Sequence, residues 1–418
     1  MGAIAPPLMG LTRGRLRPDV WVVVAVATLL ACGSEGAEGS NGGGSGGAAE
    51  LFCNEKMPWG ECRSYLPSER LALKSFLQYL EVARTPPAGE FVGHGIVMSG
   101  GPGHVLQALA NLRVLRAVHG STMPVEFWHA FEISAAACAA LADLGAQCRA
   151  LRMPGVYPQW HTVLPAIMSS SFRHVLWLDT DITPLVAPER LFETEAYKDT
   201  GALFWPDHWG AGCRRFGATA WRHHVLWDLL AIPYDETDPR CVAEHEAGHM
   251  LIDKERHWKP ICLANYLASR DFFTRVMHAY KDVFRFAWLK LNATNWLSPI
   301  RPGVVGLHDR GEIVAPHMLH LWPGADDLGL GKWGAQVPLY VHQKKRPARL
   351  WEEVVTFRAP LGACAPSRIL QNSFSLGSGD DMDVWDISDR HPEMVELFRG
   401  VEDVWELGWR EAKERFFS

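Results

Sequence analysis

The chain has 418 residues, of which 48% are hydrophobic and 21% are charged, and it carries a formal net charge of −6 at pH 7. This length and apolar content are enough to bury a sizeable core, as one large domain with appendages or as two domains. Since the sequence provides no overall positive charge to attract a polyanion, we expect no nucleic-acid partner.

The N-terminus predicts a membrane-targeting segment and a flexible stem. Residues 1–19 contain several arginines and would form a short cytosolic tail, and residues 20–32 (VWVVVAVATLLAC) form an apolar run. This run is short for a spanning helix and fits a signal anchor or a signal peptide, with the rest of the chain beyond the membrane. The letters LLACG also resemble a bacterial lipoprotein cleavage box, so a secreted or lipid-anchored protein is the alternative. Residues 33–50 are rich in Gly and Ser, as in a flexible stem.

The cysteines indicate a secretory compartment. The chain has nine, and the eight beyond the N-terminal segment make an even number, as a disulfide framework requires. Cys53 with Cys62 and Cys138 with Cys148 are the nearest pairs in sequence, although spacing alone does not fix the pairing. No C-x-x-C zinc pair occurs. A glycosylation sequon begins at Asn292 and agrees with lumenal exposure.

The pattern of strands and helices changes along the chain. Residues 51–90 predict a small N-terminal extension with one helix (SERLALKSFLQYLEVAR). From residue 91, short apolar strands (FVGHGIVM, VEFWHAF, HVLWL) alternate with helices, which predicts βαβ units and a parallel sheet. Such sheets bind ligands at the carboxyl ends of their strands. Residues 351–418 predict a C-terminal extension of mixed helix and acidic loop.

The clearest chemical signal follows the strand at residues 174–178, where Asp179-Thr180-Asp181 begins a turn. Two carboxylates at a strand end can hold a hard divalent cation that keeps open positions for phosphate oxygens. In a nucleotide-sugar transferase, such a cation neutralises the charge that develops on the leaving diphosphate. A D-x-D pair is common on protein surfaces, but its position after an apolar strand favours a metal site.

A second motif points to a different chemistry. Residues 245–249 (HEAGH) match the zinc-protease pattern H-E-x-x-H, which needs a helix that places both histidines on one face, and a third ligand. Gly248 in the centre and the apolar residues 250–252 favour a buried strand instead. A zinc metallopeptidase is therefore the alternative function, and a helix over residues 243–253 would support it.

Four segments resemble the fungal and algal Golgi α-mannosyltransferases related to the yeast α-1,3-mannosyltransferase: GIVMSGGPGHVLQALANLRVLRAVHGSTMPVEFW, SSFRHVLWLDTDITPLVAPERLFETEAYKDTGALFWPDHW, EAGHMLIDKERHW and KDVFRFAWL. The resemblance covers roughly residues 91–345. It implies a GT-A (Rossmann-like) α/β fold with a mixed central sheet over residues 91–350, and a single-pass type II protein of the Golgi membrane. It also implies retaining transfer of mannose from GDP-mannose to an oligosaccharide or glycoprotein acceptor, with manganese or another divalent cation. A non-catalytic sugar-binding member of the fold is a further alternative.

The same resemblance implies the metal ligands and the catalytic carboxylates. Asp179 and Asp181 match the metal-binding pair, and His342 in PLYVHQKKRP matches the third ligand, with His317 and His320 as rivals. Glu246 matches a carboxylate that orients the acceptor or stabilises positive charge at the anomeric carbon, or else a strand-end carboxylate bonded to backbone. Asp282 would hold a sugar hydroxyl or Lys281, or else cap a helix.

The resemblance also implies the residues that contact the two substrates. The nucleotide sugar is assigned to Val97, Met98, Ser99, Gly100, Arg113 and Lys344, with Lys345 as an alternative near the diphosphate. The acceptor sugar is assigned to Gly248, Trp205 and Asp207. Gly248 is expected to let the backbone approach the ligand closely.

Overall fold

The computed structural model describes residues 51–54, 56–82, 86, 89–151, 162–210, 222–277, 280–309, 312–330, 336–342, 353–357, 373–375, 382–386 and 392–417. Within these ranges, no helix has both the length and the apolar character that a membrane crossing needs. The predicted tail, anchor and stem at residues 1–50 lie outside the described residues.

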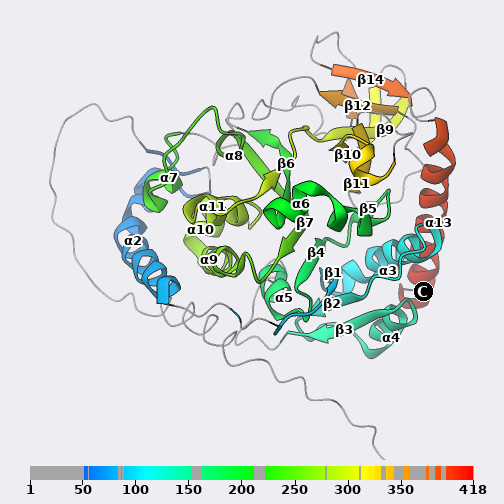
Figure 1. Ribbon diagram of the computed structural model, residues 1–418, viewed down its shortest axis with the longest axis horizontal. Coiled ribbons are helices and arrows are strands. Elements are labelled where there is room, and N and C mark those ends of the chain that lie inside the picture. The colour runs from blue at the N-terminus through cyan, green and yellow to red at the C-terminus, as the bar shows by residue number, and fades with distance from the viewer. Residues whose placement is uncertain are drawn as a thin grey trace, which may run out of the picture.

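A mixed seven-stranded sheet occupies the centre of the molecule (Figure 1). Its strands are, in order across the sheet, β3 (Ala146–Ala150), β2 (Val125–His129), β1 (His94–Ser99), β4 (His174–Leu178), β7 (Ala243–Asp253), β6 (Ala202–Gly210) and β8 (Trp296–Leu297). The first four run parallel, as the alternation of strands and helices predicts, whereas β7 runs antiparallel to both β4 and β6. The predicted class, an α/β fold with a mixed central sheet, is confirmed.

Two layers bury the two faces of this sheet. Helices cover one face and contribute to its hydrophobic core: α2 (Trp59–Val82), α5 (Val163–Ser169), α7 (Val225–Leu230), α9 (Trp258–Ala268), α10 (Asp271–Val276) and α11 (Asp282–Lys290). The other face packs on α3 (Val105–Arg113), α4 (Ala135–Asp143), α6 (Glu195–Thr200) and a second sheet. The short helix α8 (Pro239–Val242) leads directly into β7. Because both faces are covered, the central strands are apolar on both sides.

The second sheet is antiparallel and was not predicted. Its strands are, in order, β14 (Met382–Asp386), β12 (Glu353–Phe357), β9 (Gly303–Asp309), β10 (Glu312–Pro323), β11 (Gln336–His342) and β5 (Ile182–Pro184), with β13 (Ser373–Ser375) paired to β10. Strand β5 begins just after β4 ends, so the segment between them joins the two sheets. The D-x-D turn is therefore fixed from both sheets.

The C-terminal helix α13 (Pro392–Phe417) packs along α3 (Figure 1). Its residues Phe398, Val401 and Trp405 are buried in one cluster with Ala110 and Val114. At the Gly408 position, an added Cβ would lie 3.2 Å from the Cα of Ala110, so the two helices approach closely. Helix α13, which lies in the predicted C-terminal extension, thus packs against α3 of the central domain.

The two candidate cysteine pairs that lie nearest in sequence are bonded, a pairing that spacing alone left open. Disulfides join Cys53 to Cys62 and Cys138 to Cys148. Cys241 and Cys262 are reduced and buried, whereas residues 213 and 364 lie outside the described residues.

Candidate functional site

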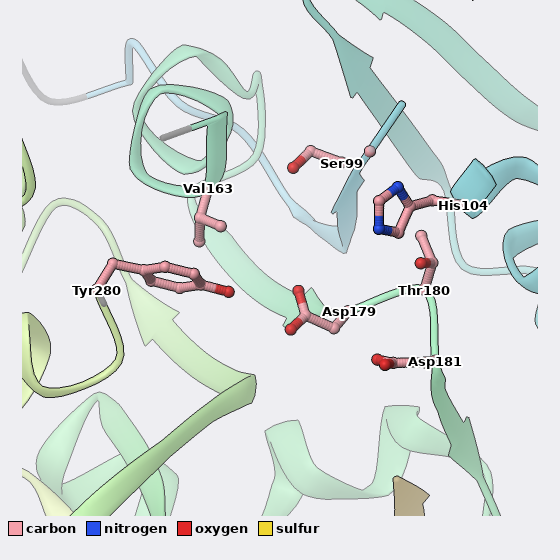
Figure 2. Close-up of a pocket in the computed structure, with 8 residues that line it drawn as sticks. Ser99, His104, Val163, Asp179, Thr180, Asp181 and Tyr280 are labelled. Carbon is pink, nitrogen blue, oxygen red and sulfur yellow. The ribbon is translucent and has the colours of Figure 1, made fainter. Parts of the chain in front are cut away.

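A polar cavity of about 190 Å³ lies at the carboxyl ends of β1 and β4 (Figure 2). It is lined by Ser99, Gly100, His104, Val163, Asp179, Thr180, Asp181 and Tyr280. The carboxyl edge of the parallel strands is where ligands bind in open α/β sheets. Four of the residues predicted from the sequence meet here, because β1 and β4 are direct neighbours and end at the same level.

The side chain of Asn111 in α3 fixes the D-x-D turn through three hydrogen bonds. Its side-chain amide donates to the carbonyl oxygens of Thr180 (2.8 Å) and Ile182 (2.9 Å), and its carbonyl accepts from the hydroxyl of Thr183 (2.7 Å). The side chain is completely buried. Sequence reasoning missed Asn111, although one polar residue on the apolar face of a helix (LANLRVL) is a usable signal, since buried amides are normally hydrogen-bonded.

The backbone of Gly248 in β7 holds the front of the same turn. Its carbonyl accepts from the amide of Asp179 (2.7 Å), and its amide donates to Oε1 of Glu246 (2.8 Å). An added Cβ would lie 3.0 Å from Cδ1 of Ile182. The packing of Ile182 therefore favours glycine at this position, and the close approach of a ligand to Gly248 stays a prediction.

The cavity concentrates negative charge. Burial and the neighbouring Asp181 raise the pKa of Asp179 well above its ordinary value, and the hydroxyl of Tyr280 bonds to the same carboxyl. Nε2 of His342 lies 3.3 Å from Oδ2 of Asp181, and its Nδ1 lies 3.9 Å from Oε2 of Glu246. Burial alone would lower the pKa of His342, but these carboxylates raise it to about 10. The protonated imidazole of His342 therefore interacts with three carboxylates, those of Asp181, Glu246 and Asp179.

The donor set fits a divalent cation. Two aspartates and one imidazole offer the oxygen and nitrogen ligands that manganese accepts in proteins. Among the described residues, only His129, Cys138 and Cys148 bring three ligand atoms within 4.8 Å of one another, and both sulfurs there are bonded in a disulfide. The three predicted ligands are more widely spread, so they must rotate toward an ion to hold it together.

Glu246 lies beside His342, next to the residues that line the cavity. Its carboxyl is largely buried, and burial raises its pKa above the ordinary value. Next to it, Lys281 forms an ion pair with Asp207 and lies 3.6 Å from Glu244. The pKa of Lys281 would fall on burial, but these two carboxylates raise it. Asp207 therefore lies near Glu246 with its charge already paired, and its assignment to the acceptor sugar stays a prediction.

Asp282 contributes to the raised pKa of Lys281, but its direct contacts lie elsewhere. Its side chain is fully buried, with the guanidinium Nε of Arg285 at 3.1 Å, and its carboxylate accepts from the backbone amide of His245 (3.2 Å). Lys281 pairs with Asp207 instead, and Asp282 is the first residue of α11 rather than its cap. These contacts of Asp282 hold α11 against β7, and its full burial argues against contact with a sugar.

The HEAGH segment is a strand, not a helix. Residues 243–253 form β7, whose pairing with β6 is irregular between Leu203 and Trp205. His245 and His249 therefore pack on opposite faces although they are four residues apart. His245 stacks on Phe204 at 5.0 Å between ring centroids, whereas His249 packs on Trp205 at 4.5 Å. Phe204 and Trp205 are consecutive residues of β6 and so face opposite sides. The two histidines therefore cannot bind one zinc ion, and the metallopeptidase alternative fails.

Several predicted contacts lie away from the cavity. Trp205 is fully buried between the two sheets against Trp322 and Tyr340, so it cannot contact an acceptor sugar. Arg113 at the end of α3 pairs with Glu411 of α13. The second sheet buries Trp205, and α13 supplies the partner of Arg113. The sequence predicted the position of neither element.

The remaining predictions have mixed outcomes. The side chains of Val97 and Met98 are buried in the core, so only the end of β1, at Ser99 and Gly100, reaches the cavity. Asn292 is exposed in the turn after α11, as a glycosylation site must be. Lys344 lies outside the described residues, as does Lys345.

His342 is the histidine that the fold brings to the D-x-D turn. It pairs with Ile182 across β11 and β5, which sets its ring beside Asp181. Its rival His320 packs against His249 at 4.3 Å between ring centroids, and His317 is buried on β10. The antiparallel pairing of a late strand with β5 thus completes the site.

Comparisons with known proteins agree with this geometry. Residues 93–223 match the family described as "Mannosyltransferase putative". The chain is 26% identical over 243 residues to the α-1,2-mannosyltransferase MNN21 of Candida albicans, covering 47% of this chain and 37% of that protein. It is 30% identical over 190 residues to the α-1,2-mannosyltransferase MNN2 of Saccharomyces cerevisiae, covering 42% and 30%. The predicted resemblance to fungal α-mannosyltransferases is confirmed, with α-1,2 enzymes in place of the α-1,3 enzyme.

The chain spans about a third of the length of these curated relatives. Among solved structures, it matches core-mannan synthase A from Aspergillus fumigatus with a TM-score of 0.34 and 8% identity, over 60% of this chain and 76% of that one. It matches the mannosyltransferase Ktr4p from S. cerevisiae with a TM-score of 0.32 and 9% identity, over 57% and 78%.

Proposed function

We propose that this chain is a metal-dependent retaining glycosyltransferase that moves mannose from GDP-mannose onto a glycan acceptor. The observation that carries the proposal is the meeting of Asp179, Asp181, His342 and Glu246 at the carboxyl edge of the central sheet. The similarity to fungal α-1,2-mannosyltransferases supports the reaction class.

Asp179, Asp181 and His342 would hold a manganese ion or another divalent cation. When bound, the cation supplies positive charge to the diphosphate and stabilises it as a leaving group. The carboxylates need that charge in turn, because burial and mutual repulsion raise the pKa of Asp179. The buried Asn111 and Gly248 keep the turn in place, so the ligands are oriented before the donor arrives.

Glu246 would act on the transferred sugar. Its Oε1 accepts from the amide of Gly248, which fixes the carboxyl, while its Oε2 lies toward His342 and the cavity region. A carboxylate in this position stabilises positive charge at the anomeric carbon or orients the attacking hydroxyl. The paired Lys281 and Asp207 beside it would bind sugar hydroxyls.

We place this activity in a Golgi-type lumen, with the chain anchored to the membrane through residues 20–32. Two disulfides and an exposed sequon at Asn292 support an oxidising, glycosylating compartment. The alternative is a secreted or lipid-anchored protein.

The test is a donor panel. The purified chain is incubated with Mn²⁺ and several nucleotide sugars, including GDP-mannose, with mannosides as acceptors, and donor hydrolysis and transfer are measured together. We expect transfer from GDP-mannose that EDTA abolishes and that retains the α configuration. Donor binding without turnover would favour a non-catalytic sugar-binding protein, and absence of both binding and turnover for every donor would refute the proposal.

A further inference from the structure

We propose that His104 donates a hydrogen bond from Nε2–H to the diphosphate of the nucleotide donor, and that the turn at residues 100–101 exists to hold its ring for this purpose. This role depends on the proposed function, because a diphosphate must occupy the same cavity. It assigns a phosphate-binding side chain that the sequence did not suggest.

His104 is placed at the mouth of the D-x-D cavity by local structure. It is the last residue of a 3-10 turn (Pro102–His104), directly before α3 begins. Its ring lines the cavity together with Asp179 and Asp181, and Figure 2 shows it across the cavity from Tyr280. An anion that bridges β1 and the D-x-D turn would therefore meet this imidazole.

One hydrogen bond fixes the tautomer of the ring. The backbone amide of Gly101 donates to Nδ1 of His104 (3.2 Å), so Nδ1 must carry a lone pair. A neutral imidazole has its hydrogen on the other nitrogen, and Nε2 of His104 is then a donor. A nitrogen that carries hydrogen cannot bind a metal, so His104 serves the anion and not the cation.

The glycine before this bond is needed for the position of the ring. A Cβ added at Gly100 would lie 2.6 Å from Cβ and 2.8 Å from Cγ of His104, which is closer than non-bonded carbons approach. Any side chain at residue 100 would push the imidazole out of place. Gly100, which was predicted to contact the nucleotide, therefore leaves room for the ring of His104.

Two of the hydroxyl groups that line the cavity, those of Ser99 and Tyr280, already have protein partners. Ser99 shares a hydrogen bond of 2.8 Å with Thr162, and the hydroxyl of Tyr280 bonds to Asp179. From Nε2 of His104, in contrast, no hydrogen bond reaches another residue that the structure describes. Since the cavity is otherwise acidic, a bound diphosphate gains most from this donor.

Two substitutions separate this role from a structural one. Asparagine places an acceptor near the position of Nδ1, and glutamine places a donor near the position of Nε2. We expect His104→Asn to weaken binding of GDP in the presence of Mn²⁺ by about 10- to 100-fold, as the loss of a hydrogen bond to a charged group does. His104→Gln should stay within about threefold of the unaltered chain, and neither should alter binding of guanosine.

Isothermal titration with GDP, GMP and guanosine measures these affinities in the full chain. His94→Asn, at the opposite end of β1, is the matched control and should leave all of them unchanged. If His104→Asn melts at a lower temperature, His104→Gln is compared with His104→Leu, because both lose the acceptor and only glutamine keeps the donor.

The outcomes distinguish the two proposals. If His104→Gln binds GDP weakly and His104→Asn binds it normally, His104 only anchors the turn. Equal GDP binding by all variants would also overturn its proposed role. If the unaltered chain binds no nucleoside diphosphate with Mn²⁺, the proposed function itself is refuted.

Discussion

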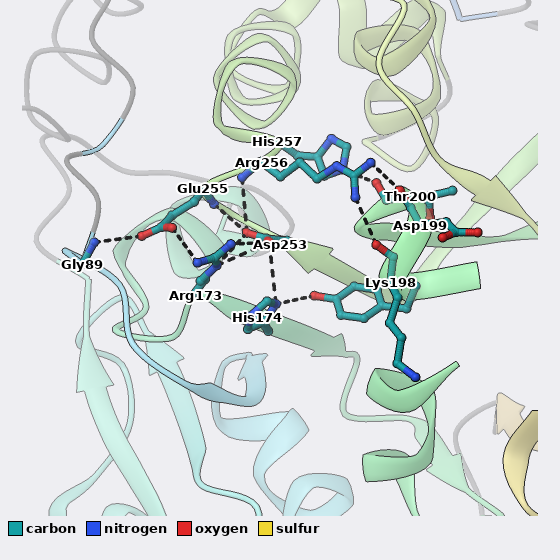
Figure 3. A network of polar contacts seen from close by, with 11 residues as sticks. Gly89, Arg173, His174, Lys198, Asp199, Thr200, Asp253, Glu255, Arg256 and His257 are labelled. Carbon is teal, nitrogen blue, oxygen red and sulfur yellow. Dashed lines mark hydrogen bonds and ion pairs between the residues drawn. The ribbon is translucent and has the colours of Figure 1, made fainter. Parts of the chain in front are cut away.

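Aspartates lie at both ends of β4, and the pKa of Asp179 at one end shifts in the opposite direction from that of Asp253 at the other. At the carboxyl end, Asp179 and Asp181 face a cavity in which burial and mutual repulsion raise the pKa of Asp179. At the other end, Asp253 of β7 pairs with His174 in the sheet and lies in a dense polar network (Figure 3). Both sites use the same residue type on neighbouring strands, so the surroundings decide what each does.

The carboxylate of Asp253 is fully satisfied. It accepts two hydrogen bonds from the side chain of Arg173, at 3.0 and 3.2 Å, and others from the backbone amides of Glu255 and Arg256. Burial alone would raise its pKa, but Arg173 and the amides lower it. A saturated carboxylate stabilises the fold, whereas the unsaturated group at the other end requires a cation.

The largest expected effect comes from Asp181→Asn. Removing one charge from the metal-binding pair should reduce metal-dependent transfer at least about 10³-fold, because the leaving diphosphate loses its stabilisation. Stability should change little, because the relief of repulsion with Asp179 is offset by the loss of the pairing between Asp181 and His342. Transfer assays and thermal melting check this, and a variant that retains most of its Mn²⁺-dependent transfer would refute the metal role of Asp181.

A second prediction concerns the pH dependence of metal binding. His342 has a pKa of about 10 without metal, so it carries a proton at neutral pH that a ligand nitrogen must release. Lowering the pH therefore opposes binding. We expect Mn²⁺ affinity to rise by up to about tenfold per pH unit, or roughly 100-fold from pH 6.5 to 8.5.

Electron paramagnetic resonance of free Mn²⁺ measures these affinities. In His342→Gln the slope should disappear over this range, together with part of the affinity. A slope that persists in the glutamine variant would assign the released proton to another group.

The third prediction tests the opposite end of β4. Asp253→Asn should cost about 2 kcal/mol of the free energy of unfolding, because Arg173 loses its charged acceptor. Arg173 is 41% exposed, so water replaces part of the interaction and the cost stays below that of a fully buried pair. Metal-dependent transfer at 25 °C should remain normal.

Urea denaturation at several pH values checks the sign of this effect. The pKa of Asp253 is lower in the folded chain than its ordinary 3.8, so its contribution is present above that pH and is lost as the pH falls through the folded value. The difference between the variant and the unaltered chain should therefore shrink only in strong acid. Loss of transfer in a folded Asp253→Asn variant would contradict the purely structural role that we assign to Asp253.

Local patterns were sufficient for the parallel half of the fold. Alternating strands and helices predicted β1, β2 and β4, although not the edge strand β3, and an apolar strand followed by D-x-D located the cavity. The glycine and apolar run in HEAGHMLI predicted a strand, and β7 confirms it. These features depend on neighbours within a few residues along the chain.

Pairings between distant segments could not be predicted in this way. The second sheet brings His342 to Ile182 across 160 residues, and only the family resemblance pointed to that histidine. The same sheet buries Trp205, which the family resemblance had assigned to the sugar site. Arg113 was assigned to the nucleotide because nothing local shows that α13 supplies Glu411 as its partner.

The smallest effect, and the sharpest probe of how the turn is held, is expected for Asn111→Ala. This change touches no predicted ligand, but it frees the carbonyls of Thr180 and Ile182 and the hydroxyl of Thr183. Because the turn can then relax, Mn²⁺ affinity should fall about tenfold, consistent with the loss of an outer-shell partner of a metal site. Asn265→Ala, another buried helical asparagine, lies in α9 on the other face of the sheet and is the control. Both variants will lose some stability, so the readout is the ratio of metal affinity to stability, and equal ratios would mean that Asn111 only fills the core.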